Sequence, residues 1–494
     1  MNNRKLSFAL ALILSLSAMS CGSGGDVIGG ETTTSEGGET TPEVTTPAEI
    51  NRENAVIGLP ELDFKGETIN ILYAGEKTYA QDVTAEETGD VVDDAVVARN
   101  RSVEELLKVK LNPIVFSDNT KETAEHLAKV ILAGEDLYDL ASVHQSYSKA
   151  YVSEGYYHNF ANDQYIDFDK PWWNNEYMDE MVVGSERKFF LIGDISLMYL
   201  KSLGCIYYNK DLYESIYKDP DEPYDLVFDG KWTFEKFDEL TRGAYSDLNG
   251  NGTVDKADQF GAFGSKNKSV EHFVYGAGIR STTKNKDGIP ELTLYNEKTV
   301  SFAELLHKLY YENQGFLIAP NNQFTEELPM FQNGQVLFAP TWLRYADTFR
   351  DMKTDYGIVC MPKFLESDEY STLVHDGTTV FVAPTTSKKT DMIGAVCEAF
   401  AFFNYKSVTP AYYEVALKVK YSRDDATAQM LDLIHSSAFT NFGYVYASQL
   451  DGLTSVREFV VNGAEDFASW YKSKESAALT GLAEVIETYK GIDG

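Results

Sequence analysis

The run TINILYA at residues 68–74 opens the stretch that decides the fold, because its short apolar alternation predicts a β-strand. Two further strand-like runs follow at residues 111–116 and 138–143. Between the three runs lie residues 93–109 and 123–132, whose apolar residues recur at helical spacing. Strands that alternate with helices indicate βα units and a mainly parallel sheet, so we predict an α/β fold.

Length and charge set the broad class of the protein. A chain of 494 residues exceeds one ordinary hydrophobic core, so we expect two lobes. Hydrophobic residues make up 43% and charged residues 24%, which is typical of a globular protein. The formal net charge is -33, and the sequence contains no clustered Lys and Arg of the kind that displaces counterions from nucleic acid. We therefore expect no nucleic-acid partner.

The four cysteines are Cys21, Cys205, Cys360 and Cys397, and none lies in a CxxC pair. This spacing does not favour a zinc site or a thioredoxin-type motif. When Cys21 is set aside, an odd number remains, which does not suit a disulfide framework. We predict that these three are small, buried, apolar residues.

The start of the chain predicts export. Residues 1–20 have a short positive start and then an apolar run at 8–16, which is the layout of a secretory signal peptide and is too short to span a membrane comfortably. Cys21 follows small residues and resembles the acylated cysteine of the bacterial lipoprotein lipobox. Ala18 and Met19 depart from the usual lipobox pattern. Cleavage of an ordinary signal peptide without lipidation is the alternative.

Residues 21–60 are predicted to form a disordered lipoprotein tether. Gly, Ser, Thr, Glu and Pro dominate the first part of this range, and such a composition has little apolar surface to bury. A flexible tether of this length spans on the order of 35 Å. No other segment is long and apolar enough to cross a bilayer. We expect the folded body to be held by lipid at the outer face of the cell membrane.

A series of motifs follows in the second half of the chain. In order, they are GCIYYNKDLYE at 204–214, KWTFEKFDEL at 231–240, DLNGNGTVDKADQFG at 247–261, MFQNGQVLFAPTW at 330–342, YGIVCMPK at 356–363 and the segment 395–403. Their order and spacing resemble the extracellular solute-binding proteins of bacterial ABC importers, the carbohydrate-type family. Trp232, in the second motif, is expected to be structural.

The resemblance implies a two-lobed, periplasmic-binding-protein-like fold of type II, with a ligand cleft and a hinge. It also implies a monomer that needs no cofactor, binds a sugar or oligosaccharide, delivers it to the permease subunits of an ABC importer and catalyses nothing. The expected parts are lobe 1 at 61–200, lobe 2 at 201–370, a return segment to lobe 1 at 371–408, and mainly helical lobe 2 and C-terminal segments at 409–494.

Aromatic and polar residues near strand ends are the candidate ligand contacts, because rings pack on sugar faces and carboxylates or amides bind hydroxyls. Trp342 lies where the resemblance places a ligand-stacking ring; a core or hinge position is the alternative. For Trp172 and Trp173 the alternative is the core, and for Asp194 it is a plain turn. The other candidates, all at or just beyond strand ends, are Tyr73, Glu76, His144, Gln145 and Asp376.

The loop at 247–258 predicts a structural Ca²⁺ site, because its oxygen-bearing residues have EF-hand spacing and Gly252 stands at the turn position. The predicted ligands are Asp247, Asn249, Asn251, Thr253, Asp255 and Asp258. The shorter Asp258 replaces the usual bidentate Glu at the twelfth position. The alternative is an acidic surface turn held by Asx hydrogen bonds without a metal.

Two other functions are weighed against an importer-linked binding protein. With 76 Asp and Glu residues, a carboxylate pair for glycoside hydrolysis can always be nominated, so abundance alone does not indicate an enzyme. The sequence contains no HExxH, GxSxG, strand-linked GxGxxG or P-loop motif. A surface glycan-binding protein that feeds no importer is the other alternative, and permease genes beside this one would argue against it.

Overall fold

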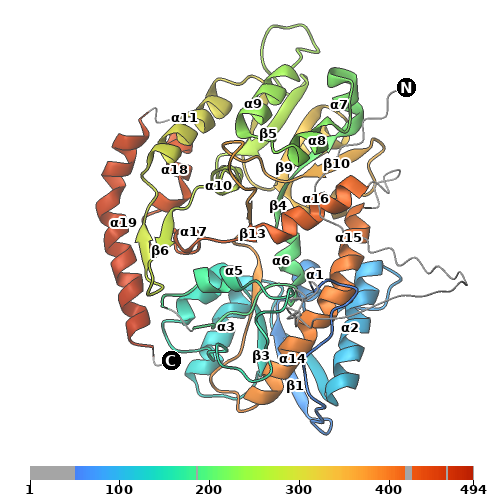
Figure 1. Ribbon diagram of the computed structural model, residues 1–494, viewed down its shortest axis with the longest axis vertical. Coiled ribbons are helices and arrows are strands. Elements are labelled where there is room, and N and C mark those ends of the chain that lie inside the picture. The colour runs from blue at the N-terminus through green and yellow to red at the C-terminus, as the bar shows by residue number, and fades with distance from the viewer. Residues whose placement is uncertain (1–49, 185–186, 418–424, 463–465, 493–494) are drawn as a thin grey trace, which may run out of the picture. The chain divides into compact units, whose positions relative to one another are not determined.

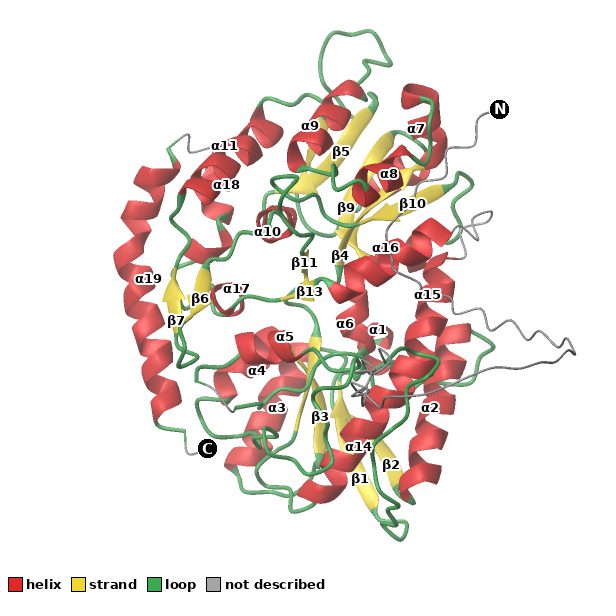
Figure 2. Ribbon diagram, in the orientation of Figure 1, coloured by secondary structure: helices red, strands yellow, loops and turns green. Residues whose placement is uncertain are grey.

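The computed structural model describes residues 50–184, 187–417, 425–462 and 466–492. The predicted signal peptide, Cys21 and the predicted tether up to residue 49 lie outside the described residues. Residues 50–494 form one unit by their contacts. Figure 1 and Figure 2 show the two larger sheets of this unit as separate groups of strands, and α6 (Leu197–Lys201) and β11 (Thr372–Leu373) lie between them.

The first lobe contains a four-stranded sheet in the order β12-β3-β1-β2. The strands are β1 (Thr68–Tyr73), β2 (Lys110–Val115), β3 (Leu140–His144) and β12 (Thr379–Val382). β1 pairs in parallel with β2 and β3, whereas β12, which comes from much later in the chain, pairs antiparallel with β3. The predicted βα pattern and its mainly parallel sheet are confirmed.

Three helices accompany this sheet, namely α2 (Val91–Leu107), α3 (Thr120–Leu132) and α14 (Thr390–Phe403). The side chain of Asp90 accepts hydrogen bonds from the first backbone N–H groups of α2, and Asn119 does the same for α3. These caps fix where the helices begin. The helical spacing read from residues 93–109 and 123–132 therefore corresponds to α2 and α3, each with an earlier start.

The second lobe contains a five-stranded mixed sheet in the order β10-β4-β9-β5-β8. The strands are β4 (Gly204–Asn209), β5 (Phe260–Ser265), β8 (Phe316–Ala319), β9 (Val336–Trp342) and β10 (Tyr356–Val359). β5 runs parallel to β8 and β9, and β4 is antiparallel to β9 and β10. Every residue of β4, β5, β9 and β10 is buried, which explains their near-continuous apolar runs.

The helices of the second lobe include the motif segments quoted above. They are α7 (Lys210–Tyr217), α8 (Glu222–Phe228), α9 (Phe234–Gly243), α10 (Lys268–Gly276), α11 (Glu297–Tyr311) and α12 (Glu327–Gln332). Trp232 precedes α9, is fully buried, and donates its indole N–H to the Cys360 carbonyl at 2.9 Å. Its predicted structural role is confirmed.

The C-terminal part is helical, with α15 (Thr409–Leu417), α16 (Asp425–Ser436), α17 (Phe442–Val445), α18 (Arg457–Asn462) and α19 (Phe467–Lys490). The short helices are α1 (Lys77–Ala80), α4 (Gln145–Ser148), α5 (Asn175–Glu180), α6 (Leu197–Lys201) and α13 (Ala346–Phe349). The short strands are β6 (Thr282–Lys284), β7 (Pro290–Leu292), β11 (Thr372–Leu373) and β13 (Ala438–Phe439). None of the described helices combines the length and apolar character that a membrane span needs.

Residues 50–60 belong to the folded unit, although the tether was predicted to extend to residue 60. Arg52 forms an ion pair with Asp432 at 3.3 Å, and its backbone carbonyl accepts a hydrogen bond from Lys406. Ala55 is buried. The end of the predicted tether is therefore corrected to a point before residue 52, because these contacts supply the burial that the composition alone did not reveal.

The cysteines Cys205, Cys360 and Cys397 are buried and free, as predicted. Burial raises the pKa of each thiol, so none is a reactive thiolate at neutral pH.

Candidate functional site

The carboxyl ends of parallel strands from both sheets meet at one place, which is where α/β proteins commonly bind ligands. β3 ends at His144 in the first lobe, and β9 ends at Trp342 in the second. The segment that returns to the first lobe passes between them, since the ring of His375 meets that of Trp342 edge to face at 4.7 Å. We take this junction of the two lobes as the candidate functional site.

A cavity of about 460 Å³ lies on the first-lobe side of this junction, at the end of β1. It is lined by Tyr73, Lys77, Ala80, Gln81, Thr84, Ala85, Glu86, Thr88 and Asp93. The buried Asp93 carboxylate accepts hydrogen bonds from Gln81 at 2.5 Å and from Lys77 at 3.0 Å. Burial raises the pKa of Asp93, but these two donors outweigh it, so the net shift is downward. The predicted Tyr73 lines the cavity, whereas the neighbouring Glu76 is exposed and does not.

The second-lobe side presents a stack of aromatic rings. Trp342 is only 2% exposed, and Tyr345 lies over it with their ring centroids 5.7 Å apart and their planes at 26°. The indole N–H of Trp342 donates to Nε2 of the buried His272. Tyr345 is half-buried and is the outer ring of the pair. Trp342 therefore lies behind Tyr345, and sequence reasoning selected the inner ring rather than the outer one.

The first lobe contributes a second group of rings, around the end of β3. His144 lies 6.3 Å from Tyr79 of α1 and 4.7 Å from Tyr147 of α4, measured between ring centroids. Tyr147 is 40% exposed. Burial lowers the pKa of His144 to about 4 and that of His272 to about 3, so both imidazoles are neutral at neutral pH. These two histidine rings therefore add no positive charge to the site.

An ion pair joins the two lobes beside these rings. Lys268, the first residue of α10, contacts both oxygens of Asp376 at 2.8 Å and also lies 3.2 Å from Glu271. Arg457 lies 3.1 Å from Glu271 on its other side. Burial raises the pKa of Asp376, but the charge of Lys268 and its hydrogen bonds outweigh that effect and hold the pKa far below its ordinary value. Asp376, predicted as a ligand contact, is thus already paired.

Four other predicted contacts are buried elsewhere. The indole N–H groups of Trp172 and Trp173 donate to the two oxygens of Glu398 at 3.2 and 2.8 Å. Asp194 accepts from Thr409, and Gln145 accepts from Tyr177. All four predicted residues are at most 7% exposed and none lines the cavity. The core alternative therefore describes Trp172 and Trp173, and Asp194 and Gln145 are also buried rather than open to the cavity.

The loop at 247–258 is closed by hydrogen bonds among its own groups. The Asp247 carboxylate accepts from the backbone N–H groups of Gly250 and Gly252, at 2.7 and 2.9 Å. Asn249 and Asn251 both donate to Asp255. This is the Asx-bonded turn named as the alternative. Within the described residues, no group of three or more His, Cys, Asp or Glu side chains is arranged to hold a metal.

Two further residues of the predicted calcium site have hydrogen-bond partners. The hydroxyl of Thr253, whose backbone carbonyl is the predicted ligand, donates to Asn251 at 2.6 Å. Asp258 is fully buried and accepts from Tyr245 at 3.0 Å, which turns one of its oxygens toward the protein. The side chains at the EF-hand positions therefore lie near one another, and the calcium site stays a prediction.

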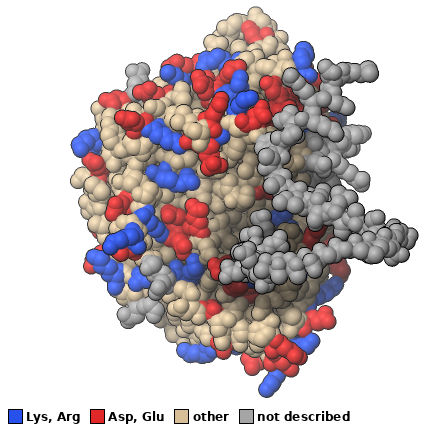
Figure 3. Space-filling model, in the orientation of Figure 1, with Lys and Arg blue, Asp and Glu red and all other residues tan. Residues whose placement is uncertain are grey.

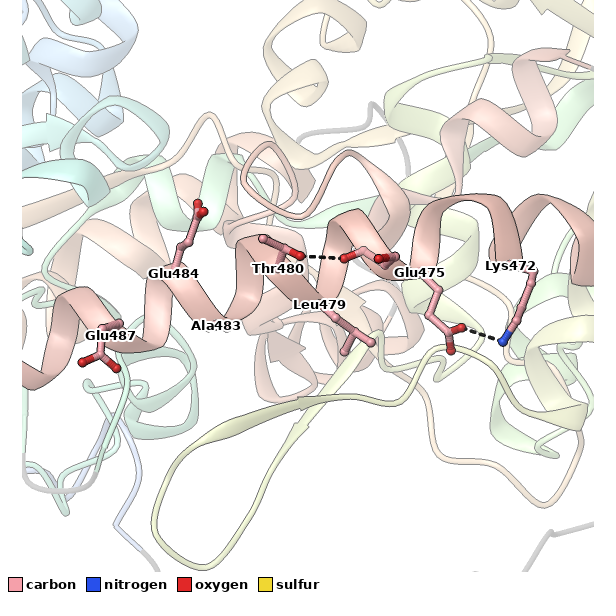
Figure 4. Close-up of a pocket in the computed structure, with 8 residues that line it drawn as sticks. Lys472, Glu475, Leu479, Thr480, Ala483, Glu484 and Glu487 are labelled. Carbon is pink, nitrogen blue, oxygen red and sulfur yellow. Dashed lines mark hydrogen bonds and ion pairs between the residues drawn. The ribbon is translucent and has the colours of Figure 1, made fainter.

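A larger hollow of about 800 Å³ runs along the outer face of α19 (Figure 4). Its residues come from that helix alone and are Lys472, Glu475, Ser476, Leu479, Thr480, Ala483, Glu484 and Glu487. They include no aromatic ring, and the hollow lies away from the strand ends. The smaller cavity at the junction of the lobes is the stronger candidate because buried polar groups and rings converge there.

Charge on the face drawn in Figure 3 does not indicate another kind of site. On the face drawn in Figure 3, Lys and Arg side chains are interspersed with Asp and Glu among the described residues. Interspersed charges of both signs do not make the basic stripe that nucleic-acid binding requires.

Comparison with known proteins identifies the fold of this chain. No protein-family model matches the chain, and none of the curated proteins matches it. A cyclo/maltodextrin-binding protein complexed with maltotetraose is similar in structure, with a TM-score of 0.55 and 12% identity over 86% of this chain and 97% of the other.

Two further structures are similar over comparable lengths. An ABC transporter solute-binding protein from Thermotoga lettingae, bound with α-D-tagatose, has a TM-score of 0.52 and 13% identity over 86% of this chain and all of the other. UgpB from Mycobacterium tuberculosis, in complex with glycerophosphocholine, has a TM-score of 0.53 and 13% identity over 81% of this chain and all of the other. The chain therefore has the two-lobed α/β fold of the ABC-importer solute-binding proteins, as the order of its motifs predicted.

Proposed function

We propose that this chain is an exported solute-binding protein that holds a sugar or oligosaccharide between its lobes and delivers it to an ABC importer permease. The observation that carries the proposal is the junction of the lobes, where the half-buried ring of Tyr345 covers Trp342 on the second-lobe side and a polar cavity lies at the end of β1 on the first-lobe side. The similar structures include a cyclo/maltodextrin-binding protein complexed with maltotetraose and a solute-binding protein bound with α-D-tagatose, which supports a sugar as the solute.

The chemistry of the site suits a sugar. A pyranose ring has apolar C–H faces, which pack on aromatic rings such as Tyr345, Tyr79 and Tyr147 at low cost in conformational entropy. Its hydroxyl groups need hydrogen-bond partners, and the cavity beside α1 is lined mainly by polar side chains. A ligand that bridges the rings and the cavity contacts both lobes, and such contacts favour the closed arrangement of the lobes.

Binding without catalysis agrees better with the carboxylates of the site than glycoside hydrolysis does. A glycosidase needs two carboxyl groups, one of which has a raised pKa so that it can act as the general acid. Of the carboxyl groups at the junction, Glu271 has a pKa raised by burial, but it is 1% exposed and is held between Lys268 and Arg457. Asp93 and Asp376 have neighbours that lower the pKa of both, so neither is suited to donate a proton at neutral pH.

The first test is the Tyr345→Ala substitution. Removal of this ring should weaken sugar binding about fivefold to a hundredfold, since burial of a large aromatic face contributes about 1 to 3 kcal/mol. Calorimetric titration of both proteins with the sugar that binds the unaltered protein measures the change. Tyr295→Ala is the matched control, because Tyr295 is also exposed but lies against Tyr471 of α19. Equal affinities for Tyr345→Ala and the control would exclude Tyr345 from the site.

The lipid anchor is the second part of the proposal, and it concerns residues outside those that the structure describes. We expect Cys21 to be acylated after cleavage of the signal peptide. Expression of the complete gene in a bacterial host with a fatty-acid probe should label the protein and retain it on membranes. The Cys21→Ala variant should lose both the label and the retention. If both persist in the variant, the chain is not anchored through Cys21.

Calcium in the loop at 247–258 is the third part. The clustered oxygens of Asp247, Asn249, Asn251 and Asp255 would release their mutual hydrogen bonds to bind the cation, which wants six to eight oxygen ligands. Calcium should then raise the melting temperature of the unaltered protein relative to a sample with chelator. Asp247→Ala should abolish that difference. Identical melting curves in all four samples would show that the loop is a plain Asx turn.

The fate of the bound solute distinguishes an importer-linked binding protein from a surface glycan-binding protein that feeds no importer. Vesicles that contain the neighbouring permease and ATPase should take up labelled sugar only when this protein is added. Uptake that is unchanged by the protein would favour a surface glycan-binding role instead.

A further inference from the structure

We propose that the solute is an acidic sugar, whose carboxylate or sulfate group is bound by the guanidinium of Arg344. This inference rests on the proposed function, because it specifies the chemistry of the ligand at the same site. It starts from the partners of the basic side chains around the junction of the lobes.

Five basic side chains around this junction already have an acceptor from the protein. The pairs are Lys77 with Asp93, Lys149 with the Val445 carbonyl, Lys201 with Gln81, Lys268 with Asp376 and Arg457 with Glu271. In the chain as far as it is described, Arg344 forms no hydrogen bond or ion pair with any residue. Asp347, one turn further along, lies instead 3.9 Å from Lys201.

Arg344 lies on the aromatic stack that forms the second-lobe side of the site. Its guanidinium carbon is 4.8 Å from the centroid of Trp342 and 5.3 Å from that of Tyr345. A guanidinium that packs its flat face on rings keeps the N–H groups at its edge free for hydrogen bonds. Arg344 is half-buried, so these donors are still accessible to a ligand.

Four of the titratable groups near Arg344 are uncharged. Among the described residues, the charge of Arg344 shifts the pKa of Tyr79, His272, His375 and Tyr412. Burial lowers the pKa of both histidines and raises that of both tyrosines, so all four are uncharged at neutral pH. The effect of Arg344 on Tyr79, which belongs to the other lobe, also shows that the guanidinium reaches across the junction.

An unpaired arginine in this position favours an anion. The chain carries a net charge of -33, so acidic side chains are abundant, yet none of those that the structure describes forms an ion pair with Arg344. The five N–H donors of a guanidinium form a planar fork that matches a carboxylate or sulfate with two parallel hydrogen bonds. The adjacent Tyr345 offers a face for a sugar ring. A sugar acid satisfies both features at once, whereas a neutral sugar leaves the charge of Arg344 uncompensated.

The test is calorimetric titration of the purified protein with three trisaccharide sets: uronates such as trigalacturonate, sulfated galactose trisaccharides, and neutral trisaccharides such as maltotriose. We expect a uronate or a sulfated sugar to bind about tenfold to a hundredfold more tightly than its neutral counterpart, because hydrogen bonds to charged groups are the stronger ones. Which of the two anionic sets binds identifies the anion. Added salt should weaken this binding.

Substitution separates a role in anion recognition from a general effect on the site. Arg344→Gln should remove most of the preference for the anionic sugar and change the affinity for the neutral one less than about threefold. Arg344→Lys should restore part of the preference, since it keeps the charge but loses the fork. Arg242→Gln, on the exposed face of α9, is the control and should change nothing.

The outcomes distinguish this inference from the function on which it rests. Tight binding of a neutral sugar that Arg344→Gln leaves unaltered would overturn the acidic-sugar inference and leave the proposed function intact. If none of the three sets binds, the proposed function is contradicted and the inference fails with it.

Discussion

Replacement of Asp82 by alanine is expected to lower the free energy of unfolding by about 3 to 5 kcal/mol, the range for a buried polar network that loses one of its members. Asp82 is fully buried. Its carboxyl group accepts from the backbone N–H of Met198 at 2.9 Å, from the hydroxyl of Ser142 at 3.0 Å and from that of Thr379. These partners belong to α6, β3 and β12, so one side chain ties the first sheet to the segment that leads into the second lobe.

Urea denaturation of the two proteins measures this loss. Asp82→Asn is the control, because its amide keeps one oxygen for the Met198 N–H while its nitrogen meets the hydroxyl groups. We expect the asparagine variant to lose about half as much stability as the alanine variant. A change below about 0.5 kcal/mol for Asp82→Ala, which is usual for surface substitutions, would mean that the network does not hold these segments together.

The second large effect concerns Glu398, whose titration is expected to make the free energy of unfolding depend on pH. Burial raises the pKa of Glu398 from 4.5 to about 7, even though the indole N–H groups of Trp173 and Trp172 act in the opposite direction. The folded protein therefore holds this proton more tightly than the unfolded chain does. Its contribution to stability is full below pH 4.5 and is lost as the pH rises through 7, a change of about 3 kcal/mol.

Glu398→Gln removes this titration, because glutamine has no proton to release. The free energy of unfolding of the variant minus that of the unaltered protein should increase by about 3 kcal/mol as the pH rises from 4.5 to 8. This change is expected whether the variant is more or less stable than the parent at any one pH. Urea denaturation across that range gives the difference, and Glu487→Gln, on an exposed turn of α19, serves as the control. A constant difference between variant and parent at every pH would show that Glu398 titrates normally.

The sequence predicted the architecture well, because periodicity and local signals determine it. The alternation at residues 68–74 gave β1, and the capping residues Asp90 and Asn119 explain why α2 and α3 begin a few residues before their strongest apolar periodicity. The place of β12 in the first sheet could be predicted only from the resemblance to a known family. A strand that joins β3 from more than 200 positions away leaves no local signal of its partner.

The site was predicted less well, because position near a strand end does not reveal which way a side chain points. Tyr73 reaches the cavity, but Gln145 and Asp194, chosen by the same rule, turn into the core. Trp342 was chosen for its place in a motif, yet Tyr345, three residues later, is the ring that lies outside. The signal in the sequence that could have identified Tyr345 is its position one turn beyond the end of β9. The pairing of Asp376 with Lys268 joins segments 108 residues apart and has no counterpart in sequence spacing.

The central claim is that the junction of the two lobes binds a sugar. A thermal-shift screen of the purified protein against neutral and acidic oligosaccharides tests it most directly, since a ligand that binds only the folded state stabilises it in proportion to the logarithm of its concentration. The account predicts that at least one sugar raises the melting temperature with increasing concentration, and that Tyr345→Ala strongly reduces this rise. No shift with any sugar, or an equal shift in the Tyr345→Ala variant, would contradict it.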